Sequence, residues 1–182
     1  MAAWLCVHVV ALAAALISPA IVRAAQGTVA SDVAVKAAFL FNFAKFTEWP
    51  ALPPSAPISI CIAGDERIAA ALTQTVRGQE ISGRALAVVL RPADSASWQA
   101  CQLLFTGTDA QLSAGALIVM KTMPILTVSD RKGFSQAGGV IELYVEGGRM
   151  RFAINVDAAE DSGLRISSRL LALAKVVRND AQ

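Results

Sequence analysis

Few residues of this chain could carry out chemistry, and histidine is the scarcest of them. His8 is the only histidine in 182 residues, and it lies in an N-terminal stretch with the character of an export signal. Histidine bases, serine–histidine triads and histidine-ligated zinc sites all need an imidazole. We therefore expect an exported protein that is not an enzyme, with no catalytic residues, no metal ligands and no cofactor.

Ser129 and Lys132 have the S-x-x-K spacing of serine acyltransferases and β-lactamases. That chemistry needs both side chains one turn apart at the start of a helix, together with a K-T-G segment. Here Gly133 follows at once without a helix pattern, and Lys121-Thr122 is followed by Met123. We interpret the spacing as a chance match.

Asp65 and Glu66 lie between an apolar strand and a helix, where nucleotide-binding folds place a glycine-rich phosphate loop. Only Gly64 is present there, and carboxylates at the positive end of a helix would repel a phosphate. We expect an acidic helix cap rather than a nucleotide site. The remaining carboxylates have structural explanations, on the solvent face of a hairpin or at a helix cap: Glu142, Asp157, Glu160 and Asp161.

Two cysteines, Cys61 and Cys101, remain if Cys6 is removed with the export signal. An oxidising compartment favours their pairing. The loop they would close, about 40 residues long, corresponds to roughly 4 kcal/mol in the chain-entropy model. The alternative is two separate buried thiols that act as small apolar side chains, and the residues alone leave both interpretations open.

Residues 1–25 have the pattern of a cleavable signal peptide. Ala2 to Ile17 is nearly all apolar, Ser18-Pro19 interrupts the run, and Val22-Arg23-Ala24 offers a small-residue cleavage site. The run is shorter than the ~20 residues of a spanning helix. An uncleaved anchor is the alternative, because lysine and arginine are missing before the apolar run. We expect residues 26–182 to form one exported domain, and the net charge of +2 argues against a nucleic-acid partner.

The segment from Val35 to Pro50 holds four of the seven phenylalanines. We predict a helix from an N-cap at Ser31 to about Thr47, since the residue before a proline avoids the helical region. One stripe at helical spacing contains Val35, Phe39, Phe43 and Phe46, while Leu40 and Phe41 lie off it. A helix this apolar is either buried on a sheet or covers another chain with its second face.

Alternating strand and helix patterns predict an α/β fold in three layers, with a mixed, mostly parallel sheet flanked by helices and a C-terminal antiparallel hairpin. The predicted strands are 58–63, 85–90, 101–106, 125–129 and 164–166, and the predicted helices are 67–76, a short turn capped by Asp157, and 169–177. Residues 111–119 are ambiguous between helix and loop.

The hairpin is the clearest local signal. Gly147-Gly148 suits a two-residue turn between strands 140–145 and 150–156. In that register Val145 faces Met150, Leu143 faces Phe152 and Ile141 faces Ile154 on one apolar face. Tyr144 then faces Arg151, and Glu146 faces Arg149, on the other.

The chain also resembles the YfiR family over nearly its whole exported length. The motifs that carry the resemblance are Lys36–Pro50, Ile58–Gly64, Cys101–Phe105, Leu126–Asp130 with Gly133-Phe134 and Gly138-Gly139, Arg151–Asn155 and Leu164–Leu171. The resemblance implies a periplasmic, non-catalytic protein that binds and represses the sensor domain of an inner-membrane diguanylate cyclase, modulated by redox state and an outer-membrane lipoprotein. Cys61 and Cys101 lie where the family's core disulfide is expected, whereas cysteines for a second, later disulfide are missing.

We accordingly expect a regulator of cyclic-di-GMP signalling and biofilm, with a small-molecule-binding module for another membrane sensor or transport system as the alternative. The expected partners are the membrane sensor, the outer-membrane lipoprotein and a second copy of the chain. The candidate partner-binding residues are Phe41, Trp49, Tyr144, Arg151 and Leu164.

Overall fold

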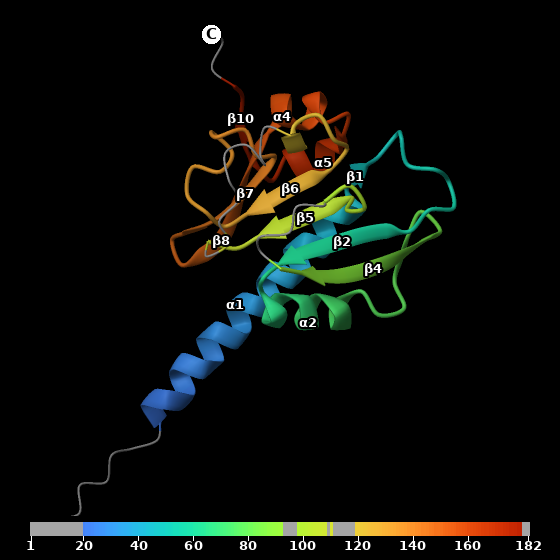
Figure 1. Ribbon diagram of the computed structural model, residues 1–182. Coiled ribbons are helices and arrows are strands. Elements are labelled where there is room, and N and C mark those ends of the chain that lie inside the picture. Colours follow the sequence, from blue (N-terminus) through green and yellow to red (C-terminus); the bar gives the residue numbers. More distant parts are fainter. Residues whose placement is uncertain (1–19, 93–97, 109, 111–118, 180–182) are drawn as a thin grey trace, which may run out of the picture.

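The computed structural model describes residues 20–92, 98–108, 110 and 119–179 (Figure 1). Eight strands form one sheet in the order β10-β8-β7-β6-β5-β2-β4-β3, and β1 pairs with β9 in a second, two-stranded sheet. The strand bounds are β1 Thr47–Glu48, β2 Ile58–Ala63, β3 Glu80–Ile81, β4 Arg84–Arg91, β5 Leu103–Thr106, β6 Leu126–Ser129, β7 Ile141–Glu146, β8 Arg149–Asn155, β9 Arg165–Ile166 and β10 Lys175–Val177.

The central five strands run parallel in the order β4-β2-β5-β6-β7. From β2 the chain crosses to β4 on one side and then returns to β5 on the other. The carboxyl ends of β2 and β5 are therefore a topological switch point, the place where open α/β sheets usually hold ligands.

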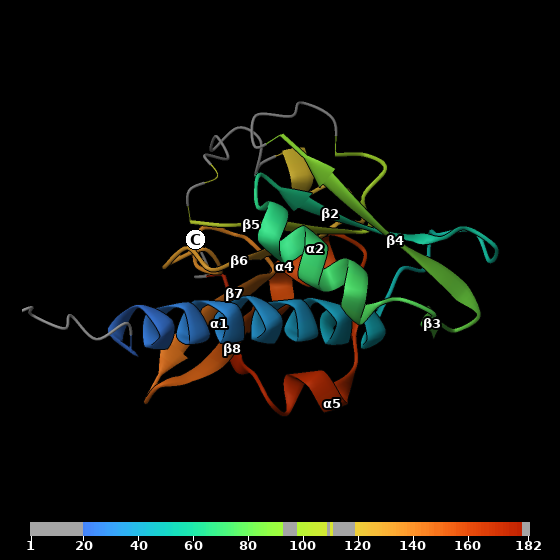
Figure 2. The ribbon, with the colours of Figure 1, turned by 90° about the horizontal axis from the view of Figure 1, so that it is seen from below.

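Four helices supply the apolar cover of one face of the sheet: α1 (Ala20–Lys45), α2 (Glu66–Thr75), α4 (Val156–Asp161) and α5 (Ser168–Leu171). Figure 2 shows α1 running across the sheet with α2 beside it. The core between these layers contains the rings of Phe43 and Phe152, whose centroids lie 5.1 Å apart, with Phe39 at 5.7 Å from both.

The opposite face of the sheet has a second, smaller core. Ile60 and Ile62 of β2 point to the helical side, so Cys61 and Ala63 point away from it. Around them gather the buried side chains of the connecting segments: Trp98, Cys101, Ala110, Met120 and Ile125, with Leu104 of β5. The expected mixed, mostly parallel sheet flanked by helices is confirmed.

The hairpin prediction is confirmed residue by residue. β7 and β8 pair as Ile141–Ile154, Leu143–Phe152 and Val145–Met150, with Tyr144 opposite Arg151 on the other side. Both turn glycines have positive φ, 57° at Gly147 and 72° at Gly148, which is the backbone that a two-residue primed turn needs.

The predicted ends of the first helix were wrong. α1 begins at Ala20 and ends at Lys45, so Ser31 lies inside the helix rather than at its N-cap, and Thr47 starts β1. From residue 32 onward, where the structure describes the side chains of α1, the buried ones are Ala37, Leu40, Phe43 and Ala44, whereas Val35 is 37% exposed. Leu40, which seemed to lie off the apolar stripe, is thus on the buried face, because the small alanines beside it allow close approach to the core.

The C-terminal predictions also need correction. Asn155, not Asp157, caps α4 by accepting from the Ala158 N–H at 3.0 Å. The last helix covers only Ser168–Leu171, capped by Ser167. Residues 175–177 form β10, which pairs in parallel with β8, since the β-branched pair Val176-Val177 can add to the sheet edge there. The ambiguous residues 111–118 lie outside the described residues.

Candidate functional site

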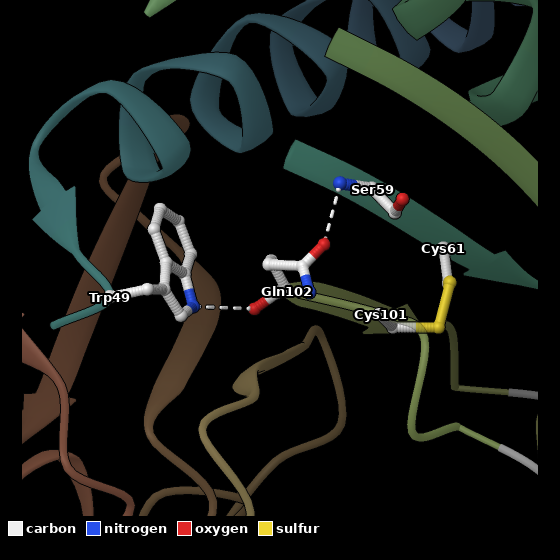
Figure 3. The surroundings of a disulfide bond; sticks show 5 residues. All are labelled: Trp49, Ser59, Cys61, Cys101 and Gln102. Carbon is white, nitrogen blue, oxygen red and sulfur yellow. Dashed lines mark hydrogen bonds between the residues drawn. A yellow bond between two sulfur atoms is a disulfide. The ribbon is translucent and has the colours of Figure 1, made fainter. Parts of the chain in front are cut away.

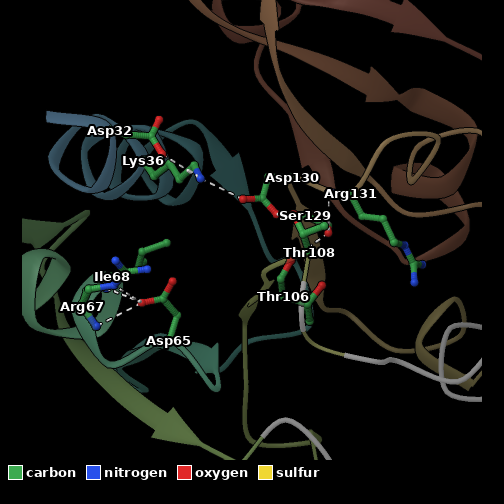
Figure 4. Close-up of polar contacts among 10 residues, drawn as sticks. All are labelled: Asp32, Lys36, Asp65, Arg67, Ile68, Thr106, Thr108, Ser129, Asp130 and Arg131. Atoms are coloured by element: carbon green, nitrogen blue, oxygen red, sulfur yellow. Dashed lines mark hydrogen bonds and ion pairs between the residues drawn. The ribbon is translucent and has the colours of Figure 1, made fainter. Parts of the chain in front are cut away.

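A cleft of about 590 Å³ opens at the switch point. We call it the switch-point cleft; it is lined by Lys36, Ala63, Gly64, Asp65, Glu66, Arg67, Gly107, Thr108, Ala110 and Asp130. These residues come from α1, from the start of α2 and from the ends of β2, β5 and β6 and the segments that follow them. Figure 4 shows five of them: Lys36, Asp65, Arg67, Thr108 and Asp130. Strand order, not proximity in sequence, brings them together.

Lys36 and Asp130 form the central ion pair of this cleft. The Lys36 Nζ lies 2.8 Å from Asp130 Oδ2 and 3.0 Å from Asp32 Oδ2, one helical turn away on α1. Burial opposes the charge of Lys36, but its hydrogen bonds to both carboxylates outweigh that cost and raise the pKa of Lys36 above its ordinary value. Asp130 also accepts from the Thr108 hydroxyl at 2.9 Å.

Asp65 occupies the N-terminal end of α2, as the sequence predicts. Its Oδ1 accepts from the N–H groups of Arg67 and Ile68, at 3.0 Å and 3.1 Å. The first amides of the helix are thus satisfied by a carboxylate of the chain itself. An anion at this end would have to compete with Asp65.

Ser129 has a structural position. It is the last residue of β6, its hydroxyl donates to the Thr106 carbonyl at 2.7 Å, and it accepts from the Arg131 N–H at 3.1 Å. Neither Ser129 nor Lys132 is on a helix, so the arrangement required by S-x-x-K chemistry is missing from this part of the chain.

The predicted pairing of Cys61 with Cys101 is present, with Cα atoms 5.8 Å apart. It joins β2 to the segment before β5 (Figure 3). Gln102, next to Cys101, accepts at its carbonyl from Trp49 Nε1 at 3.0 Å, and its side-chain Oε1 accepts from the Ser59 N–H at 2.8 Å. The disulfide is therefore built into the joint between β1, β2 and β5.

The burial of Glu142 was predicted wrongly from the sequence. We expected it on the solvent face of the hairpin, but it is only 7% exposed. Its carboxylate accepts from the N–H of Gly133 at 3.0 Å, and from the N–H and hydroxyl of Ser135 at 3.1 and 2.8 Å. The alternation of apolar and polar residues in the hairpin predicts that this face is exposed to solvent. In the structure the segment after β6 covers it, and no local sequence pattern indicates that cover.

The same segment explains the motif glycines of residues 133–139. Gly133 has a φ of 80°, a conformation that favours glycine. A Cβ on Gly139 would lie 2.1 Å from Cε1 of Phe134. Asn155 Nδ2, at the end of β8, donates to the Ser135 carbonyl at 2.8 Å, so the hairpin also holds residues 133–139 in place. Its sequence pattern therefore has a folding role.

The candidate partner-binding residues divide into two groups. Trp49 and Leu164 are buried, at 7% and 4% exposure, and flank the β1–β9 pair. Phe41 and Tyr144 are half-buried and Arg151 is exposed. The structure brings Tyr144 and Arg151 together as cross-strand neighbours. Tyr144, but not Arg151, also lines a second cleft of about 620 Å³, together with Glu142, Lys132 and Lys175.

In the described part of the chain, no set of three or more histidine, cysteine, aspartate or glutamate side chains could hold a metal ion. No helix of the described residues is long and apolar enough to cross a bilayer. What the switch-point cleft offers is a mixed set of fixed charges and hydrogen-bonding groups. Such a set can recognise a polar molecule or a protein side chain.

The fold and this site define an α/β protein with an open cleft at the switch point of its sheet. The Cys61–Cys101 disulfide links β2 to the segment before β5. Residues 33–175 match the family model described as YfiR/HmsC-like. The match covers most of the 182 residues, and the chain belongs to the YfiR/HmsC-like family.

Proposed function

We propose that this protein is a periplasmic, non-catalytic regulator that binds and represses the sensor domain of an inner-membrane diguanylate cyclase. The observation that carries the proposal is the family match over residues 33–175. Repression requires only that the protein binds the inactive sensor conformation more tightly than the active one. A rigid α/β scaffold with exposed edges suits that role.

The cell location is part of the proposal. The Cys61–Cys101 bond is typical of an oxidising compartment, which supports export. Export with cleavage after about residue 25 would cut within α1, which spans Ala20–Lys45, and would leave Lys36 and the core residues of that helix in place. Mass spectrometry of the protein from the periplasm tests this. The mass of a chain that begins near Gln26 supports cleavage, and the mass of the full chain contradicts it.

The decisive test of repression is deletion of the gene with measurement of cyclic-di-GMP and biofilm. We expect both to rise and to return to normal when the chain is supplied in trans. Unchanged cyclic-di-GMP on deletion would overturn the proposal. A catalytically dead cyclase in the same strain is the control, because deletion should then have no effect.

We propose the hairpin face that carries Tyr144 and Arg151 as a partner-binding surface. The two side chains lie opposite each other, and aromatic and arginine residues dominate binding energy at interfaces. Phe41 is a second aromatic candidate and is half-buried, whereas the side chains of Trp49 and Leu164 offer little area because they are buried. Pull-down of the sensor by the double variant Tyr144→Ser, Arg151→Glu should fail.

The matched control for that pull-down is Arg169→Glu, which makes the same charge change at an exposed position on α5. Retained capture by Arg169→Glu with loss in the hairpin variant supports the surface. Equal capture by both variants would remove the hairpin face from the proposal without touching the repression claim.

A second candidate function is a small-molecule-binding module for a membrane sensor. The switch-point cleft favours it, because ligands of open α/β sheets bind at this position and about 590 Å³ is within the range of ligand pockets. Thermal-shift screening of periplasmic metabolites against wild type and Asp130→Asn tests it. A ligand that stabilises only the wild type supports the module.

A further inference from the structure

The outer edge of β4 has unpaired backbone over most of its length. On its inner side β4 pairs with β2 from Leu86 to Arg91, whereas on its outer side β3 pairs only with Arg84 and Ala85. The remaining outer edge meets no strand in the described part of the chain. Figure 2 shows this edge at the border of the sheet, with β3 only at its far end.

The backbone groups of β4 that point outward follow from the ladder. Gly64 N–H donates to the Arg91 carbonyl at 2.9 Å, so Arg91 bonds towards β2, as do the residues at two-residue intervals before it. The N–H and carbonyl groups of Leu86, Val88 and Leu90 therefore face away from β2. Each of these groups needs a partner from water or from another chain.

Protection against edge pairing is missing along this stretch. Edge strands are usually blunted by charges, prolines or bulges. In β4 the two arginines stand at the ends, at positions 84 and 91, and the five residues of 86–90 are all apolar. Leu90 is 45% exposed, and Pro92 follows Arg91 directly.

We propose that this edge pairs with the same edge of a second copy of the chain, antiparallel, about a two-fold axis at Val88. In that register Val88 lies opposite Val88 of the second copy, and Leu86 lies opposite Leu90. Every residue with outward backbone groups then has a partner, and each such pair exchanges two hydrogen bonds. The two sheets become continuous, and the exposed edges disappear from both.

The residues at the two ends of the unpaired edge also fit this register. A strand paired in this way would reach β3 of the other copy just beyond Arg91, which lies opposite Ala85. Pro92 stands at that point, and a proline can neither donate to a ladder nor continue one. No like charges face each other, since Arg91 would lie opposite Ala85 and Arg84 opposite Pro92. A register shifted by two residues in either direction loses one of the three pairs to Pro92 or to β3.

A groove beside the edge offers space for the exposed leucine. It has a volume of about 440 Å³ and is lined by Val76, which follows α2, and by Leu86 and Val88 of β4, among others. The proposed register places Leu90 of the second copy opposite Leu86, on the same face of the sheet as this groove. Leu90 of each copy would thus lie against the groove of the other copy, so the two-fold axis produces this contact twice.

Sedimentation velocity and amide hydrogen exchange of the disulfide-bonded protein test the proposal together. We expect a monomer–dimer equilibrium in which the amides of Val88 and Leu90 become protected as concentration rises. The amides of Ala87 and Val89 should be protected at every concentration, because they bond to β2. An alternating pattern of this kind identifies edge pairing and no other dimer contact.

Leu90→Lys should raise the dissociation constant of the dimer by about tenfold. The two-fold axis repeats the Leu90–Leu86 pair, so the substitution changes two cross-strand pairs. Leu173→Lys is the matched control: Leu173 is 73% exposed, lies outside the edge, and should leave the equilibrium unchanged. A monomer at all concentrations overturns the proposal, as does a dimer in which Val88 and Leu90 exchange freely. Protection of the edge only on addition of the membrane sensor would assign it to that partner instead. None of these results depends on whether the protein represses a cyclase.

Discussion

Ser135 gives two of the three hydrogen bonds that hold the buried carboxylate of Glu142, one from its N–H at 3.1 Å and one from its hydroxyl at 2.8 Å. The third comes from the Gly133 N–H. The segment between β6 and β7 is thereby folded around a side chain of β7. A charged acceptor on three donors makes this one of the stronger polar contacts of the molecule.

Replacing Glu142 with alanine should lower the free energy of unfolding by about 3 kcal/mol, because buried donors lose a charged acceptor. Denaturant titration measures this. Glu146→Ala is the control, since its side chain is 68% exposed, and it should cost under about 0.5 kcal/mol. Similar losses in the two variants would mean that Glu142 contributes little to the fold.

Gly139→Ala should destabilise the protein by about 1–3 kcal/mol, because the added methyl meets the buried ring of Phe134. Gly107→Ala is matched to it, since nothing lies within 4 Å of a Cβ there. Thermal melts of the two variants should therefore differ clearly. A normal melt for Gly139→Ala would show that the Phe134 ring can move aside.

Lys36→Met should remove a pH-dependent part of the stability. The pKa of Lys36 is raised on folding, so its contribution is complete below its ordinary value of 10.5 and is lost as the pH rises through the raised value. Melting temperatures of wild type and variant should thus converge as the pH increases from about 9 past 10.5.

At neutral pH the same variant should cost about 1.5–3 kcal/mol, the range for a hydrogen bond to a charged group. Lys132→Met, at an exposed lysine, should show neither effect. A difference between Lys36→Met and wild type that stays constant with pH would assign the loss to packing rather than to the Lys36–Asp130 pair.

Reduction of the disulfide, or the variant Cys61→Ser with Cys101→Ser, should lower stability by roughly 4 kcal/mol for a loop of 40 residues. Denaturant titration with and without a reductant checks this. The double serine variant should no longer respond to the reductant. If reduction leaves the midpoint unchanged, the bond contributes no stability to the folded chain.

Local pattern was sufficient for the longer strands and the hairpin, but not for the short strands β1, β3 and β10 or for the site. The run 58–63 and the Gly147-Gly148 turn specify their own structure, because alternation and turn geometry act within a few residues. Lys36, Asp65, Thr108 and Asp130 meet only because of the strand order, and strand order depends on packing between distant segments. The end of the chain was mistaken for a helix for the same reason: residues 175–177 become a strand only because β8 presents a free edge to them.

Two contacts fix α1 to opposite ends of the sheet. Near its middle Lys36 bonds to Asp130, after the carboxyl end of β6, and just past its end Trp49 bonds to Gln102, before the amino end of β5. These polar contacts add to the packing of the buried Leu40 and Phe43, which lie between them on the helix side of the sheet. A molecule that bound in the switch-point cleft and displaced Lys36 from Asp130 would break only the first contact. The second contact would remain, and its acceptor Gln102 lies next to the disulfide-bonded Cys101.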